Sequence, residues 1–372
     1  MKIAIDISQV VYGTGVSNYV KNLVTGLLAI DKKNHYTLFG GSLRNRQELK
    51  NFFNQLTSGN LATKTTIISP HLANLIWNQF HILPIETITG PIDVYLSSDW
   101  AQGPTRKAKS FTIIYDLIPW LYPETLPGKI IKTHRKRMAW VKKEAGIIIA
   151  ISESTKKDLV KVIGFNEEKI TVAYPGLDKN KFYPQSKDKI AQVMKKYQLG
   201  NYILGLGTQE PRKNFPKIIN AFKNLESDLE LAIVGKYGWG KEIGNSNKKI
   251  KFLGYVPDED LAPLYSGASV FVYPSLYEGF GMPIVEAQAC GCPVITSNTS
   301  SMPEAAGQGA ILINPQKTAE ITQAIQKITL NQNLRKKLVK DGAKNARRFS
   351  WIKTAEKVLA AAQKLATNQD RQ

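Results

Sequence analysis

Short apolar runs alternate with amphipathic stretches along most of the chain. Residues 2–7 form the first run, and a loop with Gly13 and Gly15 and a helical spacing of apolar residues over 17–29 follow it. Strand, loop and helix in this order are typical of the start of an open α/β sheet. The same pattern predicts a helix at 129–143 and strands at 36–39, 65–68, 94–97, 110–115 and 146–151. It therefore indicates a parallel, doubly wound sheet.

The alternation stops between Tyr174 and Pro184, where turn-forming residues accumulate, and resumes with the run 202–206. Further strands are predicted at 229–234, 250–253, 270–273, 294–296 and 311–313. We therefore expect an α/β fold of two facing Rossmann-like, doubly wound parallel-sheet domains, 1–180 and 181–351. A C-terminal helix of about 352–372 is expected to pack back on the first domain. The carboxyl ends of both sets of strands form the expected binding cleft.

The composition agrees with a folded protein of two domains. The chain has 372 residues, of which 43% are hydrophobic and 22% are charged, which argues against a disordered or membrane-embedded protein. No apolar run approaches the ~18 residues of a spanning helix, and Asp6 lies where a signal peptide would be apolar. A cytoplasmic location is therefore expected. The two cysteines, Cys290 and Cys292, are expected to be buried structural thiols.

The formal net charge of +20 predicts a surface that attracts phosphates, anionic lipids or nucleic acid. Lysines and arginines crowd the predicted helix 129–143, which also carries apolar residues. Two interpretations stay open: a cationic amphipathic helix that lies on an anionic membrane, or a helix with its apolar stripe in the core and its lysines in water. No nucleic-acid recognition module is recognisable, so no nucleic-acid partner is expected.

Two glycine-bearing loops follow predicted strands and are candidates for binding an anion. In the first, Gly13 and Gly15 either let backbone amides approach an anion or form a simple tight turn. Asn18 stands where a dinucleotide fingerprint needs a third glycine, which disfavours NAD. The second loop, 274–281, precedes Pro283, a residue suited to the first turn of a helix. Amides near Gly281 could then hold a diphosphate.

Charged residues flank this second loop and follow another strand. Glu278 in the loop and Glu286 on the predicted helix could accept hydrogen bonds from ligand hydroxyls, or be an ordinary loop acid and a solvated helix residue. Arg212 and Lys213 follow the strand 202–206 and could neutralise a diphosphate, or be solvated surface charges. Because a nucleoside diphosphate gains charge as its bond to a sugar breaks, such cations would stabilise the transition state of sugar transfer.

A metal site is not expected. The four histidines do not cluster in the sequence. Asp258 and Asp260 form an Asp-x-Asp pair, but they precede a helical stretch, where Asp258 is predicted to be the helix N-cap. We therefore expect catalysis without a metal ion, with Lys213, Arg212 and helix amides stabilising the diphosphate in its place.

Several segments of the chain, taken together and in their order along it, resemble those of the retaining glycosyltransferases of the family 4 type, which have the two-lobed GT-B fold. The resemblance covers nearly the whole chain and is greatest to bacterial mannosyl- and rhamnosyl-transferases of polysaccharide and O-antigen assembly. It rests on the Gly13–Gly15 loop, Ala150-Ile151-Ser152-Glu153-Ser154, Pro211-Arg212-Lys213-Asn214, the Glu278 to Glu286 segment and Phe349-Ser350-Trp351.

The resemblance implies that the second domain binds the donor, and it implies roles for several of its residues. Glu286 would hold the ribose hydroxyls of the donor, Glu278 would contact the transferred sugar, and Lys213 would bind phosphate. Thr208 stands where the family usually has an arginine, for which Arg212 could compensate. The remaining donor contacts expected by position in this domain are Gly279, Phe280, Gly281, Met282 and the base-binding turn at Val256. Gly15 of the first domain is a further expected donor contact.

In the first domain, which the resemblance makes the acceptor domain, Tyr115 stands where the family often has a sugar-contacting histidine. Asp116 follows it and either hydrogen-bonds a sugar or caps the turn before Pro119. The resemblance also implies retention of configuration, with the departing phosphate oxygen taking the acceptor's proton.

The predicted function is therefore transfer of a hexose from GDP-mannose or a UDP-sugar to a saccharide or lipid-linked saccharide, without a metal or other cofactor, at the inner face of the cell membrane. The helix 129–143 is the expected membrane contact. Two alternatives are a nucleotide-sugar epimerase of similar architecture and a non-catalytic protein that binds anionic surfaces.

Overall fold

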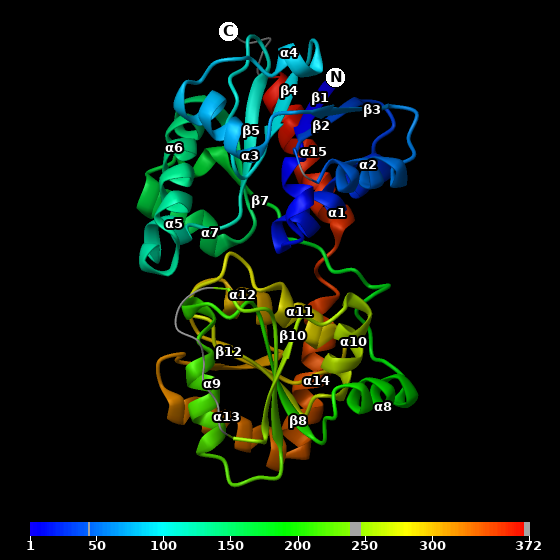
Figure 1. The fold of residues 1–372 in the computed structure, drawn as a ribbon, viewed down its shortest axis with the longest axis vertical. Coiled ribbons are helices and arrows are strands. Elements are labelled where there is room, and N and C mark those ends of the chain that lie inside the picture. The colour runs from blue at the N-terminus through cyan, green and yellow to red at the C-terminus, as the bar shows by residue number, and fades with distance from the viewer. Residues whose placement is uncertain (44, 239–246, 368–372) are drawn as a thin grey trace. The chain divides into compact units, whose positions relative to one another are not determined.

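A computed structural model describes residues 1–43, 45–238 and 247–367, which form two compact units. The first unit comprises 1–176 together with the C-terminal segment from Trp351, and the second comprises 177–350. The sequence analysis placed these boundaries at 180/181 and 351/352. Each unit is an open sheet with helices on both of its faces (Figure 1).

The first unit contains a seven-stranded parallel sheet of order β3-β2-β1-β4-β5-β6-β7. Its strands are β1 Lys2–Asp6, β2 His35–Gly41, β3 Leu61–Thr66, β4 Val94–Ser97, β5 Lys109–Ile114, β6 Ala145–Ala150 and β7 Ile170–Val172. Its α-helices are α1 Gly15–Ile30, α2 Arg46–Gln55, α3 Pro70–Ala73, α4 Glu86–Thr89, α5 Ile118–Leu121, α6 Gly128–Glu144, α7 Glu153–Asp158 and α15 Trp351–Thr367. Because β4 returns beside β1 after β2 and β3 have been added on the other side, the strand order reverses between β1 and β4.

The C-terminal helix α15 belongs to the first unit. Its Trp351 ring lies edge-on to Tyr19 of α1, with 5.2 Å between ring centroids. Thr354 Oγ1 donates to the Tyr174 carbonyl at 2.5 Å, and Lys357 Nζ donates to the Val172 carbonyl at 2.9 Å. Helix α1 approaches closely, since a Cβ on Gly26 would lie 3.1 Å from that of Ala355.

The second unit repeats the arrangement with a six-stranded parallel sheet of order β10-β9-β8-β11-β12-β13. Its strands are β8 Tyr202–Leu206, β9 Glu230–Val234, β10 Ile250–Gly254, β11 Val270–Tyr273, β12 Val294–Ser297 and β13 Ala310–Ile313. Its α-helices are α8 Lys187–Lys196, α9 Phe215–Lys223, α10 Asp258–Gly267, α11 Met282–Ala289, α12 Met302–Ala306, α13 Thr318–Leu330 and α14 Gln332–Ala346. The order reverses between β8 and β11, so the loops after these two strands lie side by side.

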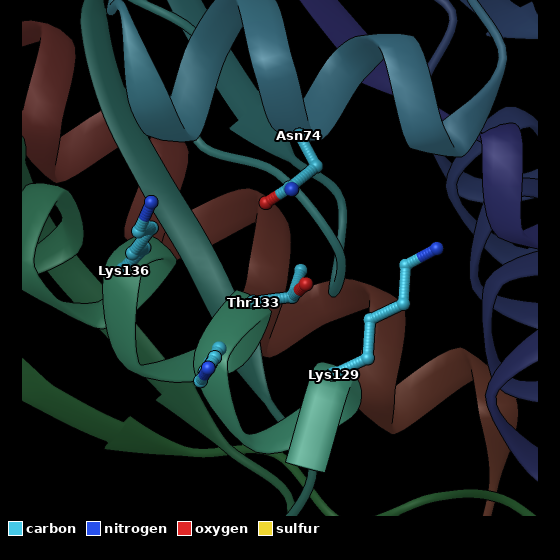
Figure 2. Close-up of a pocket in the computed structure, with 5 residues that line it drawn as sticks. Asn74, Lys129, Thr133 and Lys136 are labelled. Atoms are coloured by element: carbon cyan, nitrogen blue, oxygen red, sulfur yellow. The ribbon is translucent and has the colours of Figure 1, made fainter. Parts of the chain in front are cut away.

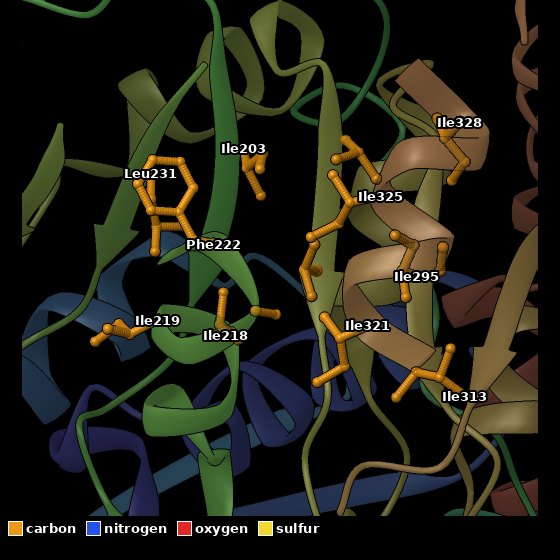
Figure 3. Packing of buried hydrophobic residues seen from close by; sticks show 14 of the residues in the cluster. Ile203, Ile218, Ile219, Phe222, Leu231, Ile295, Ile313, Ile321, Ile325 and Ile328 are labelled. Atoms are coloured by element: carbon orange, nitrogen blue, oxygen red, sulfur yellow. The ribbon is translucent and has the colours of Figure 1, made fainter. Parts of the chain in front are cut away.

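A continuous apolar core fixes this second sheet. Inward-facing residues of the strands, such as Ile203 and Ile295, pack against α9 and α13, whose Phe222 and Ile325 are buried (Figure 3). The strands are apolar on both faces because helices cover both faces of the parallel sheet. This rigid sheet positions the loops at the carboxyl ends of its strands.

The predicted α/β fold is confirmed, and the strands of the second unit match the predicted runs to within a residue at either end. Two details of the first unit were wrong. Strand β3 covers Leu61–Thr66 rather than 65–68, since it is an edge strand with a mostly exposed, polar sequence. The three-residue strand β7 was not predicted at all.

Candidate active site

The first candidate residues lie in the second unit, at the point where its strand order reverses. Lys213 follows β8 and Glu278 follows β11, and these two strands are neighbours in the sheet. Their side chains meet, with Lys213 Nζ 2.7 Å from Glu278 Oε1. In open α/β sheets, ligands bind outside the carboxyl ends of the strands at such a reversal.

The loop after β8 brings Lys213 back over the end of its own strand. Gly207 has a φ of +146°, and a Cβ there would lie 3.2 Å from Lys213 Cδ, so the lysine stem packs directly on this glycine. A 3₁₀ turn, Pro211–Lys213, ends at Asn214, whose φ is +60°. Asn214 Nδ2 donates to the carbonyls of Pro274 and Pro315, which anchors this loop to the one after β11.

Glu278 receives more than one donor at the same oxygen. Tyr273 Oη donates to Glu278 Oε1 at 2.9 Å, and Arg212 Nη1 lies 2.8 Å from that oxygen. Burial by itself raises the pKa of Glu278, but the charges of Arg212 and Lys213 outweigh it and lower the pKa to about 2. Burial lowers the pKa of Lys213, an effect that Glu278 opposes. The site therefore holds an ionised carboxylate beside a partly desolvated ammonium group.

Arg212, the second predicted cation, is held by internal partners. It is only 8% exposed, forms an ion pair with Glu210 and donates to the Tyr277 carbonyl at 2.6 Å. Its carbonyl accepts from the amide of Leu276 at 2.9 Å. These contacts make Arg212 a residue that positions Glu278 and joins the two loops.

The loop after β11 leads into α11 as predicted, with Pro283 in the first helical turn. Gly281 precedes the helix with a φ of +100°, which favours glycine. Ser301 Oγ donates to the carbonyls of Glu278 and Phe280, at 2.8 and 2.9 Å, and so holds the loop that contains Gly279. Pro283 has no amide hydrogen, and the amide of Ile284 donates to the Gly281 carbonyl at 3.0 Å. At this helix start, the amides of Gly281 and Met282 are therefore the ones that can bind an anion.

Glu286 lies about one turn into α11, the helix on which it was predicted. Tyr265 Oη donates to Glu286 Oε2 at 3.2 Å. Burial raises the pKa of Glu286 to about 7, since Lys181 and Tyr265 offset only part of the burial effect. The protonated form of Glu286 is therefore favoured below pH 7, and a higher pH or a ligand that donates hydrogen bonds to Glu286 favours the ionised form.

The remaining predicted donor contacts of this unit lie on nearby strand ends. Thr208 is exposed directly after Gly207, and its carbonyl accepts from Glu210. Val256 is buried, so only its backbone could contact a base. Tyr255 belongs to the expected base-binding turn between β10 and Val256. Its side chain is 64% exposed and lies under Lys236, with 4.6 Å between Nζ and the ring centroid.

In the first unit, the structure places Gly15 at the exposed start of α1, with Thr14 as the N-cap. A Cβ on either Gly13 or Gly15 would meet nothing within 4 Å, so this loop is open. Asp116 Oδ1 accepts from the amide of Ile118 at 3.0 Å, which is the turn-capping role considered above.

A buried polar cluster at the β1/β4 reversal of the first unit was missed by the sequence analysis. Asp6 is the last residue of β1, and Asp99 lies just beyond β4. Arg137 is 3% exposed and reaches this edge from α6, where it donates to Thr112 Oγ1 at 2.5 Å. Burial raises the pKa of Asp99 to about 6, with Arg137 opposing the rise. Several polar atoms here are buried without a hydrogen-bond partner: Gln9 Oε1, Asp99 Oδ1, Tyr115 Oη and Arg137 Nε.

The Asp-x-Asp pair is engaged in ion pairs. Asp258 Oδ2 lies 2.6 Å from Lys181 Nζ, and Asp260 Oδ2 lies 2.5 Å from Lys196 Nζ. Asp258 is the first residue of α10 rather than its N-cap, which is Pro257, so that detail was wrong. Across residues 1–43, 45–238 and 247–367, no group of three or more His, Cys, Asp or Glu side chains is arranged to hold a metal ion. Both cysteines are buried and free.

The basic helix, α6, has its apolar side in the core, where Met138 and Val141 are buried. This agrees with the second of the two interpretations considered for it. In the described part of the chain, no helix combines the length and the apolar character that crossing a membrane requires.

Comparisons with known proteins place this geometry in a family. Residues 186–345 match the family model of glycosyl transferases group 1. The O-antigen chain mannosyltransferase B of Escherichia coli is 31% identical over 261 residues, which cover 67% of this chain and 68% of that protein. The serotype-specific mannosyltransferase WbdA of E. coli is 28% identical over 264 residues, or 66% of this chain, but the match spans only 32% of that longer protein.

A solved structure supports the fold over the whole chain. Anabaena Alr3699/HepE, crystallised with UDP and glucose, superimposes with a TM-score of 0.71 at 17% identity, covering 98% of this chain and 99% of that one. The two Rossmann-like units and this structural similarity show that the chain has the GT-B architecture. The identity and coverage of the E. coli mannosyltransferase, together with the family model, show that this chain belongs to the glycosyl transferases group 1 family and is a glycosyltransferase.

Proposed function

We propose that this glycosyltransferase moves a hexose, in the first instance mannose, from a nucleoside diphosphate sugar to a saccharide or lipid-linked saccharide, with retention of configuration and without a metal. The observation that carries the proposal is the contact of Lys213 with Glu278 at the reversal of the second sheet, in a loop that leads into α11. A cation, hydrogen-bond acceptors and free helix amides are what a sugar diphosphate needs.

The donor would lie along the end of the second sheet. Its diphosphate would accept from Lys213 Nζ and from the amides of Gly281 and Met282 at the start of α11, and Glu278 would accept from hydroxyls of the transferred sugar. Glu286 would accept from the ribose hydroxyls, and the backbone at Val256, with the exposed ring of Tyr255, would contact the base. As the sugar–phosphate bond breaks, charge grows on the departing diphosphate, so Lys213 stabilises the transition state more than the ground state.

The bond changes in this proposal balance without a protein base. The acceptor hydroxyl oxygen forms a bond to C1 of the sugar, the bond between C1 and the phosphate oxygen breaks, and that oxygen takes the proton of the hydroxyl. Retention requires attack from the face that the phosphate leaves. This step follows the resemblance to retaining family members, and Glu278, whose pKa is lowered to about 2, is poorly suited to act as a base.

The first unit would bind the acceptor. Asp99 and Arg137 present buried polar atoms without partners at the β1/β4 reversal. Such atoms are costly to leave unpaired, so a hydroxyl-rich ligand would relieve that cost. Asp116 and Tyr115, at the end of the neighbouring β5, would complete this acceptor site.

The choice of donor rests on the relatives. Two E. coli relatives are named mannosyltransferases, one of an O-antigen chain, and this favours GDP-mannose. The neighbour crystallised with UDP and glucose makes UDP-glucose the donor to compare with it.

A transfer assay tests the proposal. Purified protein would be incubated in EDTA with GDP-mannose or UDP-glucose and with lipid-linked saccharide extracted from a polysaccharide-producing bacterium. We expect mannose transfer that persists in EDTA, falls at least a hundredfold in Lys213→Ala and is unchanged in the exposed control Lys223→Ala. Transfer that needs a divalent cation, or that survives loss of Lys213, would contradict the proposal; sugar conversion without an acceptor would indicate an epimerase.

A further inference from the structure

The side chain of Tyr273 contacts both charged groups at the reversal of the second sheet. Tyr273 is the last residue of β11, and its side chain is buried. Lys213 Nζ donates to Tyr273 Oη at 2.7 Å, and Tyr273 Oη donates to Glu278 Oε1 at 2.9 Å. Since Lys213 Nζ also lies 2.7 Å from Glu278 Oε1, the three polar atoms form a closed triangle in which every pair is at hydrogen-bond distance.

The chemistry of the three groups fixes the direction of these hydrogen bonds. An ammonium group has three N–H donors and no acceptor, and an ionised carboxylate only accepts. The hydroxyl of Tyr273 therefore accepts from Lys213 and gives its own proton to Glu278. These two partners engage two N–H groups of Lys213, and no third acceptor for Nζ lies among the described residues. The third N–H is therefore available to a diphosphate.

Tyr273 presents this hydroxyl from a rigid position. Strand β11 lies between β8 and β12, and the Tyr273 carbonyl accepts from Thr296 Oγ1 at 2.8 Å. The ring of Tyr273 stacks on that of Phe271, with 5.7 Å between ring centroids. Lys213 and Glu278 lie in loops, whose side chains are less firmly placed than those on strands. The sheet therefore fixes the two charged side chains through Tyr273.

Of these two side chains, Lys213 depends more on Tyr273. Arg212 Nη1 lies 2.8 Å from Glu278 Oε1, so Glu278 keeps a buried partner when the Tyr273 hydroxyl is removed. Lys213 Nζ would keep only Glu278, an acceptor that it shares with the like charge of Arg212. The stem of Lys213 packs on Gly207, but its end can rotate about single bonds. Loss of the hydroxyl would therefore free the ammonium group rather than the carboxylate.

Lysines elsewhere in the chain are not held in this way. A pocket of about 360 Å³ on the first unit is lined by Asn74, Lys129, Lys132, Thr133 and Lys136. Its three lysines are exposed residues of α6, and Figure 2 shows Lys129 and Lys136 extending apart on either side of Thr133. Fixing a lysine side chain costs rotamer entropy, so the buried, doubly bonded Lys213 indicates a site that needs its ammonium group in one place.

We propose that Tyr273 is a positioning residue for sugar transfer: its hydroxyl fixes the ammonium group of Lys213 so that the third N–H faces the departing diphosphate. The inference rests on the proposed function, which assigns to Lys213 the stabilisation of that diphosphate. Charge on the diphosphate grows as the sugar–phosphate bond breaks, so the position of the ammonium group matters more in the transition state than in the bound donor. Tyr273 acts through Lys213 rather than on the donor itself.

The kinetics of Tyr273→Phe test this role, because the substitution keeps the buried ring and removes only the hydroxyl. The assay is the transfer reaction described above, in EDTA, with whichever of GDP-mannose and UDP-glucose the wild type uses. We expect kcat to fall on the order of tenfold while KM for the donor stays within about threefold of wild type. An unchanged kcat, or a rise in KM alone, would overturn the proposal.

A matched control separates this role from the general effect of losing a buried tyrosine hydroxyl. Tyr202 is also fully buried in the second unit, and its hydroxyl donates to the Leu264 carbonyl at 2.7 Å. Tyr202→Phe should keep kcat within about twofold of wild type, because it contacts neither Lys213 nor Glu278. Equal losses of kcat in the two variants would show that Tyr273 has only a structural role.

A double variant tests whether the effect passes through Lys213. When Lys213→Ala is already present, Tyr273→Phe should lower kcat by less than about twofold. In thermal unfolding, the midpoint temperature of the double variant should fall by less than the sum of the two single decreases, because both single variants remove the same hydrogen bond. Additive effects in either measurement would overturn the proposal.

The two proposals fail in different ways. A wild-type protein that transfers no sugar would contradict the proposed function and, with it, the role of Tyr273 in transfer. Transfer by the wild type together with additive kinetics or additive unfolding would overturn the positioning role of Tyr273 alone.

Discussion

Replacing Glu286 with glutamine should stabilise the protein while it weakens donor binding. Burial raises the pKa of Glu286 from 4.5 to about 7. The folded state therefore binds a proton that the unfolded state releases between these pH values, and stability falls as the pH rises through this window. Above pH 7 the wild type bears the full cost of a buried negative charge.

The size of the effect follows from the same pKa. A change of one pKa unit corresponds to about 1.4 kcal/mol, so the full shift amounts to about 3 kcal/mol. Because Glu286 is only half-buried, we expect Glu286→Gln to raise the free energy of unfolding at pH 8 by between about 1 and 3 kcal/mol. The amide oxygen can still accept from Tyr265, so no buried donor is left unpaired.

The assay is urea unfolding at pH 5 and pH 8, with Glu226→Gln, an exposed loop substitution in the same unit, as the control. The gain should be present at pH 8 and small at pH 5, and the control should show none. Calorimetric titration with GDP or UDP should show about tenfold weaker binding, because the neutral amide accepts less strongly from ribose hydroxyls. A variant that is no more stable at pH 8, or that binds nucleotide as well as the wild type, would refute the reasoning.

Three further predictions address the neighbouring residues. Arg212→Ala removes the buried ion-pair partner of Glu210 and one of the two cations beside Glu278, so thermal unfolding should show a loss of about 3–5 kcal/mol, with little loss in the exposed control Arg347→Ala. Gly207→Ala adds a Cβ 3.2 Å from Lys213 Cδ at a φ of +146°, so it should lower the free energy of unfolding by about 1–3 kcal/mol and displace Lys213. Calorimetric titration should then show weaker nucleotide binding; unchanged affinity would show that the position of Lys213 is not critical. Glu278, with a pKa of about 2 in the folded state, stabilises the protein above pH 4.5 and loses this contribution as the pH falls toward 2, so Glu278→Gln should flatten acid unfolding curves in this range.

Much of the fold could be predicted from the sequence because buried parallel strands are continuous apolar runs. The strands of the second unit are of this kind, with Val270 to Tyr273 all buried. The edge strand β3 has an exposed, polar sequence, and its hydrogen bonds to β2 define it instead. The prediction followed the apolar residues Ile67 and Ile68 and therefore placed this strand at 65–68, too far along the chain.

The candidate site was predictable only in part. Lys213 and Glu278 each follow an apolar run, but their contact depends on β8 and β11 being neighbours, which sequence order alone does not reveal. The inward orientation of Arg212 depends on Glu210 and on the Tyr277 carbonyl, so a pattern of adjacent cations could not distinguish its role from that of Lys213.

The buried cluster of the first unit left a weaker signal in the sequence. Asp6 lies at the end of an apolar strand and Asp99 follows one, so a search for acids at strand ends would have found them. Arg137 lies within a helix rich in lysine and arginine, where nothing in the sequence separates the one buried cation from its exposed neighbours. Only packing against the sheet reveals it.

The most direct test of the donor site is calorimetric titration of GDP-mannose and UDP-glucose into the wild type and Lys213→Ala, in EDTA, with Lys223→Ala as the control. Our account predicts metal-free binding of one of these donors, weakened at least tenfold by loss of Lys213 and unaffected in the control. Binding that requires a divalent cation, or that is equally tight in Lys213→Ala, would contradict the claim that Lys213, Glu278 and α11 form the donor site.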